Sequence, residues 1–526
     1  MATKFIFVTG GVVSSLGKGV SVASIGALLQ NKGFKVKLRK LDPYLNVDPG
    51  TLNPYEHGEV FITEDGGETD LDLGHYERFT CVATSKNDNT TSGKIYSSVI
   101  QAERKGEYLG KTVQVIPHIT DAIKNFILHD TDDYDFVISE IGGTIGDIES
   151  LPFLEAIRQL KNDLGQDRVL NIHLTLLPYI ESAGEMKTKP TQNSIKNLLS
   201  IGIQADFILC RTVKHITDDV RTKISHFCNV NKNRIFEAVD TDLIYKIPVM
   251  FKAQRLDDEI LNFFNVKEKK DNKLHELKEF ISKYETMHKT VNVGIFGKYI
   301  DLQDSYKSLH EALRNTGINL GVKVNIVSFN TEDFSEDQFE NLDGIVIPGG
   351  FGSRGVDGKI NAIKFAREHN IPCLGICFGM QLMLIEFARN VLNLANANST
   401  ELDAYTNYPI VHLLNMTRDA NEIGGSMRLG NMVCNLKPGT RLAEIYKTDV
   451  VQERFRHRYG FNTQYLDDFE KAGMVFSCKD DKDVIEGVEL PNQKWFIGVQ
   501  YHPEFNSMPL KTSLLFESFV RTVAGV

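Results

Sequence analysis

The chain has 526 residues, a formal net charge of −10 and 24% charged residues. This length exceeds what one hydrophobic core normally serves, so we expect two or three domains, and the acidic balance argues against nucleic acid as a partner. Apolar runs stay below the roughly 18 residues of a transmembrane helix, the start has no signal-peptide segment, and seven scattered cysteines show no metal or disulfide spacing, so we expect a cytoplasmic protein without membrane partners.

The first predicted element is an apolar strand at 4–8 that runs into a glycine-rich loop ending in Gly17, Lys18 and Gly19. A strand, such a loop and a helix N-terminus present backbone N–H groups and a lysine charge to phosphate oxygens. The loop departs from the Walker A pattern, because Gly19 stands where Ser or Thr should follow the lysine and one extra residue separates the glycines. The segment predicts a nucleotide phosphate site.

Two acids and a basic loop follow in the same half of the chain. Glu140 ends a buried strand predicted at 134–140, and Asp72 lies in a polar loop. Carboxylate oxygens near a triphosphate suit Mg²⁺. The loop 187–192 is basic and rich in hydroxyl groups, a composition suited to several phosphate oxygens. Each feature alone would be typical of ordinary protein surface.

The middle of the chain predicts a connection between two α/β halves. Residues 266–290 are rich in Lys and Glu, with apolar residues at helical spacing, and predict an amphipathic linker helix. A fresh strand at 291–297 then begins the second half. Both halves alternate apolar strands with helices, so the fold class is α/β with two doubly wound domains.

The second half contains a predicted nucleophile elbow at Cys377. A buried strand ending at 371–375 is followed by an apolar helix at 380–388, so Cys377 lies at a strand-to-helix corner, flanked by small residues. The helix N-terminus favours a thiolate, and the N–H of Phe378 can face an oxyanion. The glycine-rich turn at 348–352 offers a second donor loop. His502 and Glu504 supply a base and its orienting group, which together predict thiol acyl chemistry.

The run Gly-Ile-Cys-Phe-Gly-Met-Gln, preceded by Pro-Gly-Gly and followed by Gln-Tyr-His-Pro-Glu-Phe, resembles the class I glutamine amidotransferases. The resemblance implies that Cys377 attacks the carboxamide of L-glutamine, that His502 moves the proton and that Glu504 holds the imidazole. Phe378 replaces a leucine usual in that family, which keeps the N–H donor. The implied glutamine-binding residues are Gly350, Phe378, Gly379, Met380, Gln381, Glu401 and Arg458.

The N-terminal motifs Gly-Gly-Val-Val-Ser-Ser-Leu-Gly-Lys-Gly, Glu-Ile-Gly-Gly-Thr-Ile-Gly-Asp-Ile-Glu and Lys-Thr-Lys-Pro-Thr-Gln resemble the synthetase half of the CTP synthases. This resemblance spans nearly the whole chain. It implies a dethiobiotin-synthetase-like amidoligase that phosphorylates O4 of UTP with ATP, after which ammonia from glutamine displaces phosphate and gives CTP in pyrimidine biosynthesis. Phosphorylation turns a poor leaving group into a good one.

The resemblance also assigns nucleotide, metal and gate residues. The implied ATP-binding residues are Ser15, Leu16, Gly17, Lys18, Gly19, Val20, Asp72, Val239, Asp240 and Thr241. The implied UTP- and CTP-binding residues are Ser14, Asp147, Ile148, Glu149, Lys187, Thr188, Lys189, Pro190, Thr191, Gln192 and Lys223. Asp72 and Glu140 would bind Mg²⁺, and Pro54, His57 and Val60 would form an ammonia gate.

As further implications of the resemblance, GTP would activate the enzyme, with Arg428 near its site, and CTP would inhibit it. The chain would form a homotetramer with UTP sites between subunits, and possible filaments. The domains would be an amidoligase at 1–265, a linker at 266–290 and a glutamine amidotransferase at 291–526.

Three other interpretations were weighed against this one. A glutamine-dependent amidoligase acting on another acceptor would need a different loop at 187–192. A non-catalytic, filament-forming homologue would have lost Lys18, Glu140, Cys377, His502 or Glu504, and all five are present. A bare glutaminase would leave the phosphate-binding signatures of the first half without a purpose.

Overall fold

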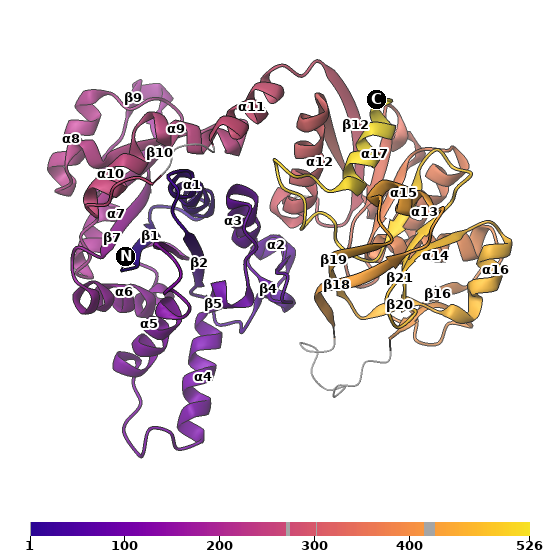
Figure 1. Ribbon diagram of the computed structural model, residues 1–526, viewed down its shortest axis with the longest axis horizontal. Helices are drawn as coiled ribbons and strands as arrows, with labels where there is room; N and C mark the ends of the chain where they lie inside the picture. Colours follow the sequence, from indigo (N-terminus) through magenta and orange to yellow (C-terminus); the bar gives the residue numbers. More distant parts are fainter. Residues whose placement is uncertain (1, 270–273, 301, 415–426) are drawn as a thin grey trace. The chain divides into compact units, whose positions relative to one another are not determined.

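The computed structural model describes residues 2–269, 274–300, 302–414 and 427–526. The chain divides into two compact units (Figure 1), Met1–Pro49 with Asp72–Ile281, called unit 1, and Gly50–Leu71 with Ser282–Val526, called unit 2. The segment 50–71 therefore belongs to unit 2 although it lies early in the sequence. Within the proposed linker, residues 274–285 form α11 (Leu274–Glu285), and residues 270–273 lie outside the described part of the chain.

Unit 1 is built on one parallel sheet, which confirms the doubly wound α/β fold. Every neighbouring pair of its strands is parallel. The strand order is β11 (Ile235–Val239), β10 (Phe207–Thr212), β7 (Val169–Leu176), β1 (Lys4–Gly10), β6 (Phe136–Ile141), β2 (Val36–Asp42) and β5 (Asn89–Thr91). Such a sheet is covered on both faces, so its central strands are buried along their whole length, as β1 and β6 are.

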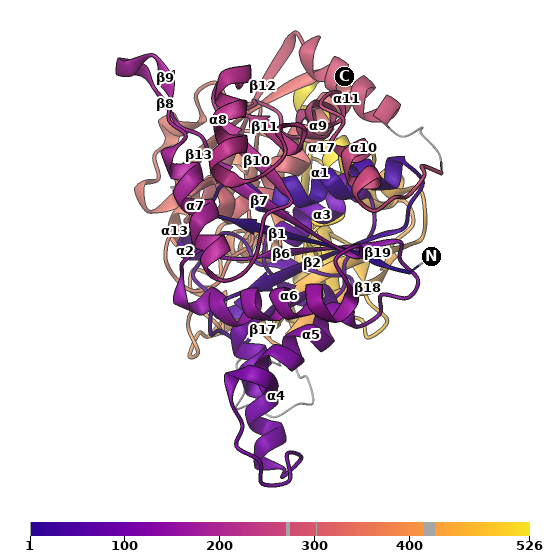
Figure 2. The same cartoon turned by 90° about the vertical axis from the view of Figure 1, so that its left-hand side faces the viewer.

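Helices cover both faces of this sheet (Figure 2). One face carries α1 (Lys18–Asn31), α3 (Asp72–Thr80), α9 (Ile247–Ala253) and α10 (Leu256–Phe263). The other carries α4 (Ser92–Arg104), α5 (Thr120–Leu128), α6 (Leu151–Leu164), α7 (Lys189–Ser200) and α8 (Asp218–Cys228). No helix in the described residues is long and apolar enough to cross a membrane.

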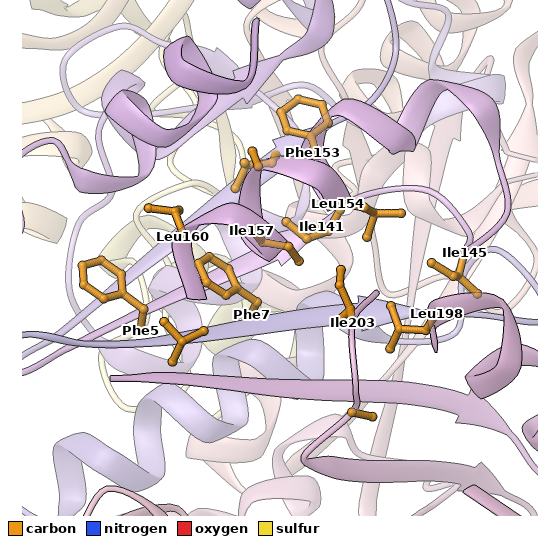
Figure 3. Close-up of a cluster of buried hydrophobic side chains, with 14 of the residues drawn as sticks. Phe5, Phe7, Ile141, Ile145, Phe153, Leu154, Ile157, Leu160, Leu198 and Ile203 are labelled. Carbon is orange, nitrogen blue, oxygen red and sulfur yellow. The ribbon is translucent and has the colours of Figure 1, made fainter. Parts of the chain in front are cut away.

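The core of unit 1 fills the space between the sheet and the second group of helices (Figure 3). Phe5 and Phe7 of β1 meet Phe153, Leu154 and Ile157 of α6, and all five side chains are buried. Fully burying one such side chain contributes about 1.5–3 kcal/mol, so this layer fixes β1 and the loop that follows it.

Unit 2 combines a parallel sheet with an antiparallel extension. The strand order is β13 (Val322–Asn330), β12 (Lys289–Gly297), β14 (Gly344–Ile347), β15 (Cys373–Ile376), β23 (Phe496–Val499), β22 (Ile485–Glu489), β21 (Val475–Lys479), β18 (Arg428–Leu436) and β19 (Val450–His457). The first five strands run parallel and the last four continue the sheet by antiparallel pairing. A separate small sheet contains β16 (Ala397–Ser399), β17 (Tyr408–Leu413) and β20 (Tyr459–Phe461).

Helices again pack on both faces of the large sheet of unit 2. One core contains α12 (Lys307–Leu320), α15 (Arg441–Tyr446) and α17 (Leu514–Ala524). The other contains α13 (Val356–Glu368), α14 (Phe378–Asn390) and α16 (Leu466–Lys471). The second group includes the helix after Cys377, so the elbow is anchored in a core.

The early segment 50–71 is attached to unit 2 by specific contacts. It contains α2 (Pro54–His57), β3 (Phe61–Ile62) and β4 (Glu68–Thr69). Phe61 is fully buried, and its ring centroid lies 5.2 Å from that of Phe505. Arg454 donates a hydrogen bond to the Ile62 carbonyl oxygen at 2.9 Å, and the N–H of Ser308 donates to Glu59 at 2.8 Å. Sequence order alone would have placed this segment with the N-terminal half.

Gly379→Ala should destabilise unit 2 by about 3 kcal/mol, because the added methyl group would clash with the backbone of β14, and no side-chain rotation can relieve that clash. A methyl group at this position would lie 2.0 Å from the Ile347 carbonyl oxygen of β14. Urea unfolding followed by fluorescence of Trp495, the single tryptophan of the chain, reports on unit 2.

Gly460→Ala is the matched control in the same unit. A methyl group there would meet only side-chain atoms of Leu414, at 3.0 Å or more. Equal losses of stability in the two variants would contradict the close packing of α14 against β14.

Candidate active sites

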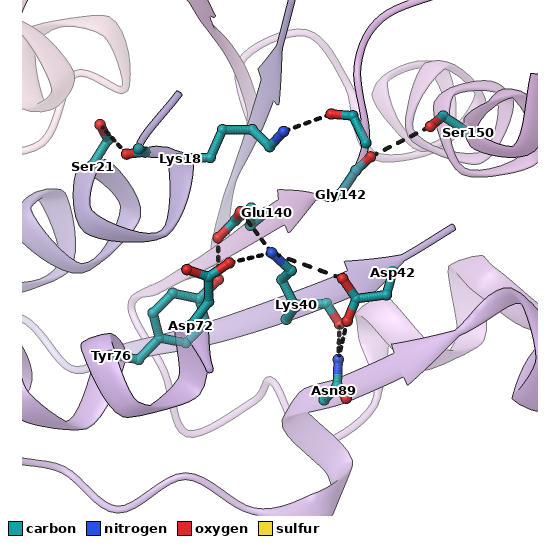
Figure 4. Close-up of polar contacts among 12 residues, drawn as sticks. Lys18, Ser21, Lys40, Asp42, Asp72, Tyr76, Asn89, Glu140, Gly142 and Ser150 are labelled. Carbon is teal, nitrogen blue, oxygen red and sulfur yellow. Dashed lines mark hydrogen bonds and ion pairs between the residues drawn. The ribbon is translucent and has the colours of Figure 1, made fainter. Parts of the chain in front are cut away.

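The predicted phosphate loop of unit 1 has the geometry of a cradle. It connects β1 to α1, and Gly17 precedes the helix with φ 93°, a left-handed conformation that glycine adopts without strain. The Nζ atom of Lys18 lies 2.5 Å from the Gly143 carbonyl oxygen (Figure 4). Burial lowers the pKa of Lys18, and the Glu140 carboxylate opposes that shift. Lysine and helix N-terminus are thus placed for phosphate oxygens.

The departure at Gly19 has a steric reason. A Cβ atom at this position would lie 1.9 Å from the Asp72 carboxylate oxygen, so any side chain here would require Asp72 to move. In a Walker A loop the hydroxyl group at this position binds Mg²⁺. In unit 1 the Asp72 carboxylate occupies the corresponding space, so an oxygen ligand is still available there.

Asp72 and Glu140 meet around the ammonium group of Lys40, as Figure 4 shows. Lys40 Nζ contacts Asp72, lies 2.9 Å from Glu140 Oε1 and lies 3.8 Å from Asp42 Oδ1. Tyr76 donates a hydrogen bond to the other Glu140 oxygen at 2.5 Å. Burial and the Asp72 charge raise the pKa of Glu140, while Lys40 and Lys18 oppose this shift. The cluster holds more negative than positive side chains, which suits a cation.

The donor set fits a Mg²⁺ ion that takes its other ligands from phosphate and water. Among the described residues, no group of three or more His, Cys, Asp and Glu side chains has the arrangement of a closed metal site. Mg²⁺ in nucleotide sites uses only one or two carboxylates, which matches Asp72 and Glu140.

The strand that ends at Val239 is connected to the phosphate loop through Arg211. Arg211 Nε donates to Asp240 Oδ1 at 2.9 Å, and its Nη1 donates to the Ser15 carbonyl oxygen at 2.9 Å. The structure thus brings the segment 239–241 to the loop 15–20. Sequence analysis did not single out Arg211 or Lys40, although each is a basic residue near the carboxyl end of a buried strand.

The segment 187–192, predicted as a basic loop, is a loop only at 187–188, because residues 189–192 form the first turn of α7, which lies against the phosphate loop. Thr191 and Gln192 are buried in its first turn, and Gln192 donates a hydrogen bond to Thr188 at 3.0 Å. A methyl group on Gly11 would lie 1.7 Å from Ser194 Oγ, so this helix and the loop after β1 are in close contact.

The other predicted pyrimidine-site residues are distributed around the same edge of the sheet. Lys187 and Lys223 both lower the pKa of the exposed Glu185, Lys187 by an ion pair and Lys223 by its charge, so the two lysines act on the same carboxylate. Asp147 accepts a hydrogen bond from the Thr144 N–H at 2.9 Å and begins the turn that contains Ile148 and Glu149. Lys189 and Pro190 begin α7, and Ser14 lies in the phosphate loop between β1 and α1.

The elbow in unit 2 is strongly bent, as the sequence predicts. Cys377 has φ 54° and ψ −107°, between the last residue of β15 and the first of α14. A non-glycine residue in this region of backbone conformation is strained and needs support from its surroundings. Support comes from the Cys377 N–H, which donates to the Val499 carbonyl oxygen at 2.7 Å, and from the close packing of Gly379.

His502 and Glu504 form the expected pair beside this thiol. His502 Nδ1 lies 2.7 Å from Glu504 Oε1, and both residues are at most 8% exposed. Burial lowers the pKa of His502, but the Glu504 carboxylate and the Cys377 sulfur together raise it to about 10. An imidazolium is therefore the expected state of His502 at neutral pH.

Two buried lysines hold the turn at 348–351, the second predicted oxyanion donor loop. Lys359 Nζ donates to the Pro348 carbonyl oxygen at 3.2 Å, and Lys298 Nζ donates to the Phe351 carbonyl oxygen. Burial and the nearby Lys298 lower the pKa of Lys359 to about 7. An added Cβ on Gly349 would lie 3.0 Å from the His502 ring and 3.5 Å from Cys377 Cβ. Because Gly349 has no side chain, the turn can lie close to the Cys377 thiol and to His502.

Cys377, His502, Glu401 and Arg458 line one cavity of about 920 Å³ within unit 2, together with Gly350. Glu401 accepts a hydrogen bond from the Gly352 N–H at 3.1 Å, and burial raises its pKa while Arg458 opposes the shift. An acid and an arginine thus line the same cavity as the thiol. The residues Phe378 to Gln381 form the buried first turn of α14 and do not line the cavity.

Pro54 and Val60, two of the three predicted gate residues, line the same cavity. His57 ends α2 and does not line it. Arg428, the residue associated with GTP, is buried in unit 2, where it pairs with Asp480 at 2.7 Å and with Glu486. Pairing with the two carboxylates allows the charged side chain of Arg428 to be buried.

Comparison with known protein families matches two separate regions of the chain. Residues 4–266 match the family described as "CTP synthase N-terminus", and residues 301–522 match "Glutamine amidotransferase class-I". The chain belongs to the CTP synthase family. It is therefore a glutamine-hydrolysing ligase that converts UTP to CTP, as the sequence resemblance implies.

Curated relatives extend over almost the whole chain. A CTP synthase of Hydrogenobaculum sp. is 55% identical over 98% of this chain and 97% of the relative. A CTP synthase of Pelagibacter ubique is 55% identical over 98% of both chains. Among solved structures, a Trypanosoma brucei CTPS glutaminase domain with bound acivicin is 35% identical, with a TM-score of 0.43, over 45% of this chain and 94% of that one.

Glu504→Gln should slow the alkylation of Cys377 at neutral pH. The Glu504 carboxylate raises the pKa of His502, so its neutralisation lowers that pKa, and the imidazolium that stabilises the thiolate is lost at a lower pH. We expect alkylation of Cys377 by iodoacetamide at pH 7 to slow by about tenfold or more. Peptide mass spectrometry measures this rate.

The exposed Cys81 in unit 1 is the internal control, and its alkylation should not change. If Glu504→Gln is alkylated at Cys377 at the native rate throughout pH 6 to 9, the result would contradict a role of the His502 and Glu504 pair in promoting the thiolate.

Proposed function

We propose that the ammonia for CTP formation is released through a covalent thioester on Cys377. The observation that carries this proposal is the cavity that Cys377 and His502 line together with Glu401 and Arg458. Arg458 is suited to the α-carboxylate of glutamine and Glu401 to its α-ammonium group, so the side-chain carboxamide would point to the thiol.

The thiolate of Cys377 attacks the carboxamide carbon, and the oxygen becomes an oxyanion. The N–H of Phe378, at the unpaired start of α14, and the turn at Gly350 stabilise that charge. The C–N bond breaks as His502 donates its proton to the leaving nitrogen, which departs as ammonia. Water, deprotonated by His502, then hydrolyses the thioester to glutamate and restores the thiolate.

In unit 1 we propose that ATP phosphorylates O4 of UTP and that ammonia displaces this phosphate, giving CTP, ADP and phosphate through 4-phosphoryl-UTP. The phosphate loop 15–20 and the segment 239–241, connected through Arg211, would bind ATP. Mg²⁺, bound by Asp72 and Glu140, would neutralise phosphate charge. Lys18 is placed to balance charge on the phosphoryl oxygens.

UTP and CTP would bind at Ser14, Asp147 to Glu149, Lys187 to Gln192 and Lys223. Support comes from the contact between α7 and the phosphate loop and from the action of Lys187 and Lys223 on the same carboxylate. We further propose GTP activation, CTP inhibition, a cytoplasmic homotetramer, and a gate at Pro54, His57 and Val60. The functional domains proposed are 1–265, 266–290 and 291–526, with the segment 50–71 packed in unit 2.

Cys377→Ala should abolish glutamine-dependent CTP synthesis and leave ammonia-dependent synthesis within about twofold of the native rate. The substitution removes the nucleophile of unit 2 and leaves the residues of unit 1 unchanged. The absorbance change from UTP to CTP, with ATP and Mg²⁺, measures both reactions.

Loss of both reactions in a folded Cys377→Ala protein would contradict two separate reaction centres. A native protein that hydrolyses glutamine but makes no CTP from either nitrogen source would contradict UTP as the acceptor.

Mixing inactive Lys18→Ala and Lys187→Ala subunits should restore partial CTP synthesis from ammonia. If UTP sites lie between subunits, some sites in a mixed tetramer receive both lysines. Subunits are mixed under dissociating conditions and assayed after reassembly. The control is each variant carried through the same procedure alone. Reassembled mixtures without activity would contradict shared sites.

A further inference from the structure

Gln500 is a fully buried residue that the reaction described above does not use. It follows β23 directly, and β23 pairs in parallel with β15, so that Val499 lies opposite Ile376. The residues that follow these two partners are Gln500 and Cys377. Neighbouring parallel strands therefore place the amide of Gln500 beside the thiol, with Nε2 3.5 Å from Cys377 Sγ.

The orientation of this amide follows from a chain of hydrogen bonds. The Tyr459 carbonyl oxygen can only accept, so the nitrogen of the Gln381 side chain must face it, at 3.0 Å. The same nitrogen lies 3.1 Å from the Gln500 side chain, which must present its oxygen to receive the second N–H. The remaining group of Gln500, its NH₂, then faces the sulfur.

The other polar neighbour of the sulfur has the opposite preference. The Arg456 carbonyl oxygen lies 3.5 Å from Cys377 Sγ and can only accept, so it favours the protonated thiol. Cys377 is 3% exposed, which leaves little access for water. A buried thiolate needs donors, and the Gln500 NH₂ is a donor that bonds to the charged form.

We propose that Gln500 is a further catalytic residue, which donates a hydrogen bond to the Cys377 thiolate in an orientation fixed by Gln381 and the Tyr459 carbonyl group. This proposal rests on the proposed role of Cys377 as nucleophile. The amide stabilises the sulfur charge before attack and again when the thioester is hydrolysed and the sulfur leaves. Gln500 does not line the glutamine cavity, so its effect falls on the thiol and not on substrate binding.

Gln500→Met, which keeps the length of the side chain and removes the donor, tests this role. Iodoacetamide alkylation of Cys377 is measured by peptide mass spectrometry from pH 5 to 10, without glutamine or nucleotides. We expect the midpoint of the rate profile to move to higher pH by about one unit, as expected for loss of a hydrogen bond to a charged group. The kcat for glutamine hydrolysis should fall about tenfold, with KM within about twofold of native.

Two comparisons separate this effect from a loss of structure. Ammonia-dependent CTP synthesis and the alkylation of exposed Cys81 should stay at native values in the variant. Gln500→Glu, which is nearly isosteric but places a carboxylate against the sulfur, should move the midpoint further than Gln500→Met. It serves as the deciding variant if the methionine protein does not fold.

A native alkylation profile in folded Gln500→Met, or a change in KM alone, would overturn the proposal. A native profile in Gln500→Glu would do the same. Because alkylation needs neither glutamine nor CTP formation, this result is distinguishable from a failure of the proposed function, in which the native protein makes no CTP from glutamine.

Discussion

The sharp turn at Cys377 is the constraint on which the second reaction centre depends. A cysteine with φ 54° has a strained backbone conformation, and the close packing around it maintains that conformation. Gly375 would clash with the sulfur of Met383 if it carried a side chain, and Gly379 would clash with the backbone of β14. The two glycines let the helix approach the sheet, and the approach fixes the thiol at the carboxyl edge of β15.

The parallel sheet then brings the remaining groups to the same edge. The turn with Gly349 follows β14, and Gln500 and His502 follow β23, the two strands that flank β15. Groups far apart in sequence meet because the ends of parallel strands meet. Unit 1 follows the same rule, since its phosphate loop follows β1 and Glu140 lies in the neighbouring β6. In both units, the order of the strands determines which groups of the candidate site lie together.

Sequence analysis could predict features that depend on local order. The elbow and the phosphate loop each require a strand, a few small residues and a helix in succession. The residues around Cys377 and Lys18 indicate this succession. It also identified a departure at Gly19, but the reason became visible only when Asp72 was found in the space beside it.

Features that depend on long-range contacts could not be predicted in this way. In the sequence Lys40 is an ordinary charged residue of a strand, and only the structure shows three acids around it. Only the structure likewise shows that Arg211 connects Ser15 to Asp240. The placement of 50–71 in unit 2 depends on contacts such as Phe61 with Phe505, which no local pattern encodes. The orientation of Gln500 similarly depends on the carbonyl group of Tyr459.

The central claim is that Glu504 keeps His502 protonated beside the Cys377 thiol before glutamine arrives. The most direct test is nitrogen NMR of the histidine-labelled native protein at pH 7, with His502→Gln used to assign the signal. The pKa of about 10 predicts that both ring nitrogens of His502 are protonated and remain so up to about pH 9. A neutral His502 ring at pH 7 would contradict the account.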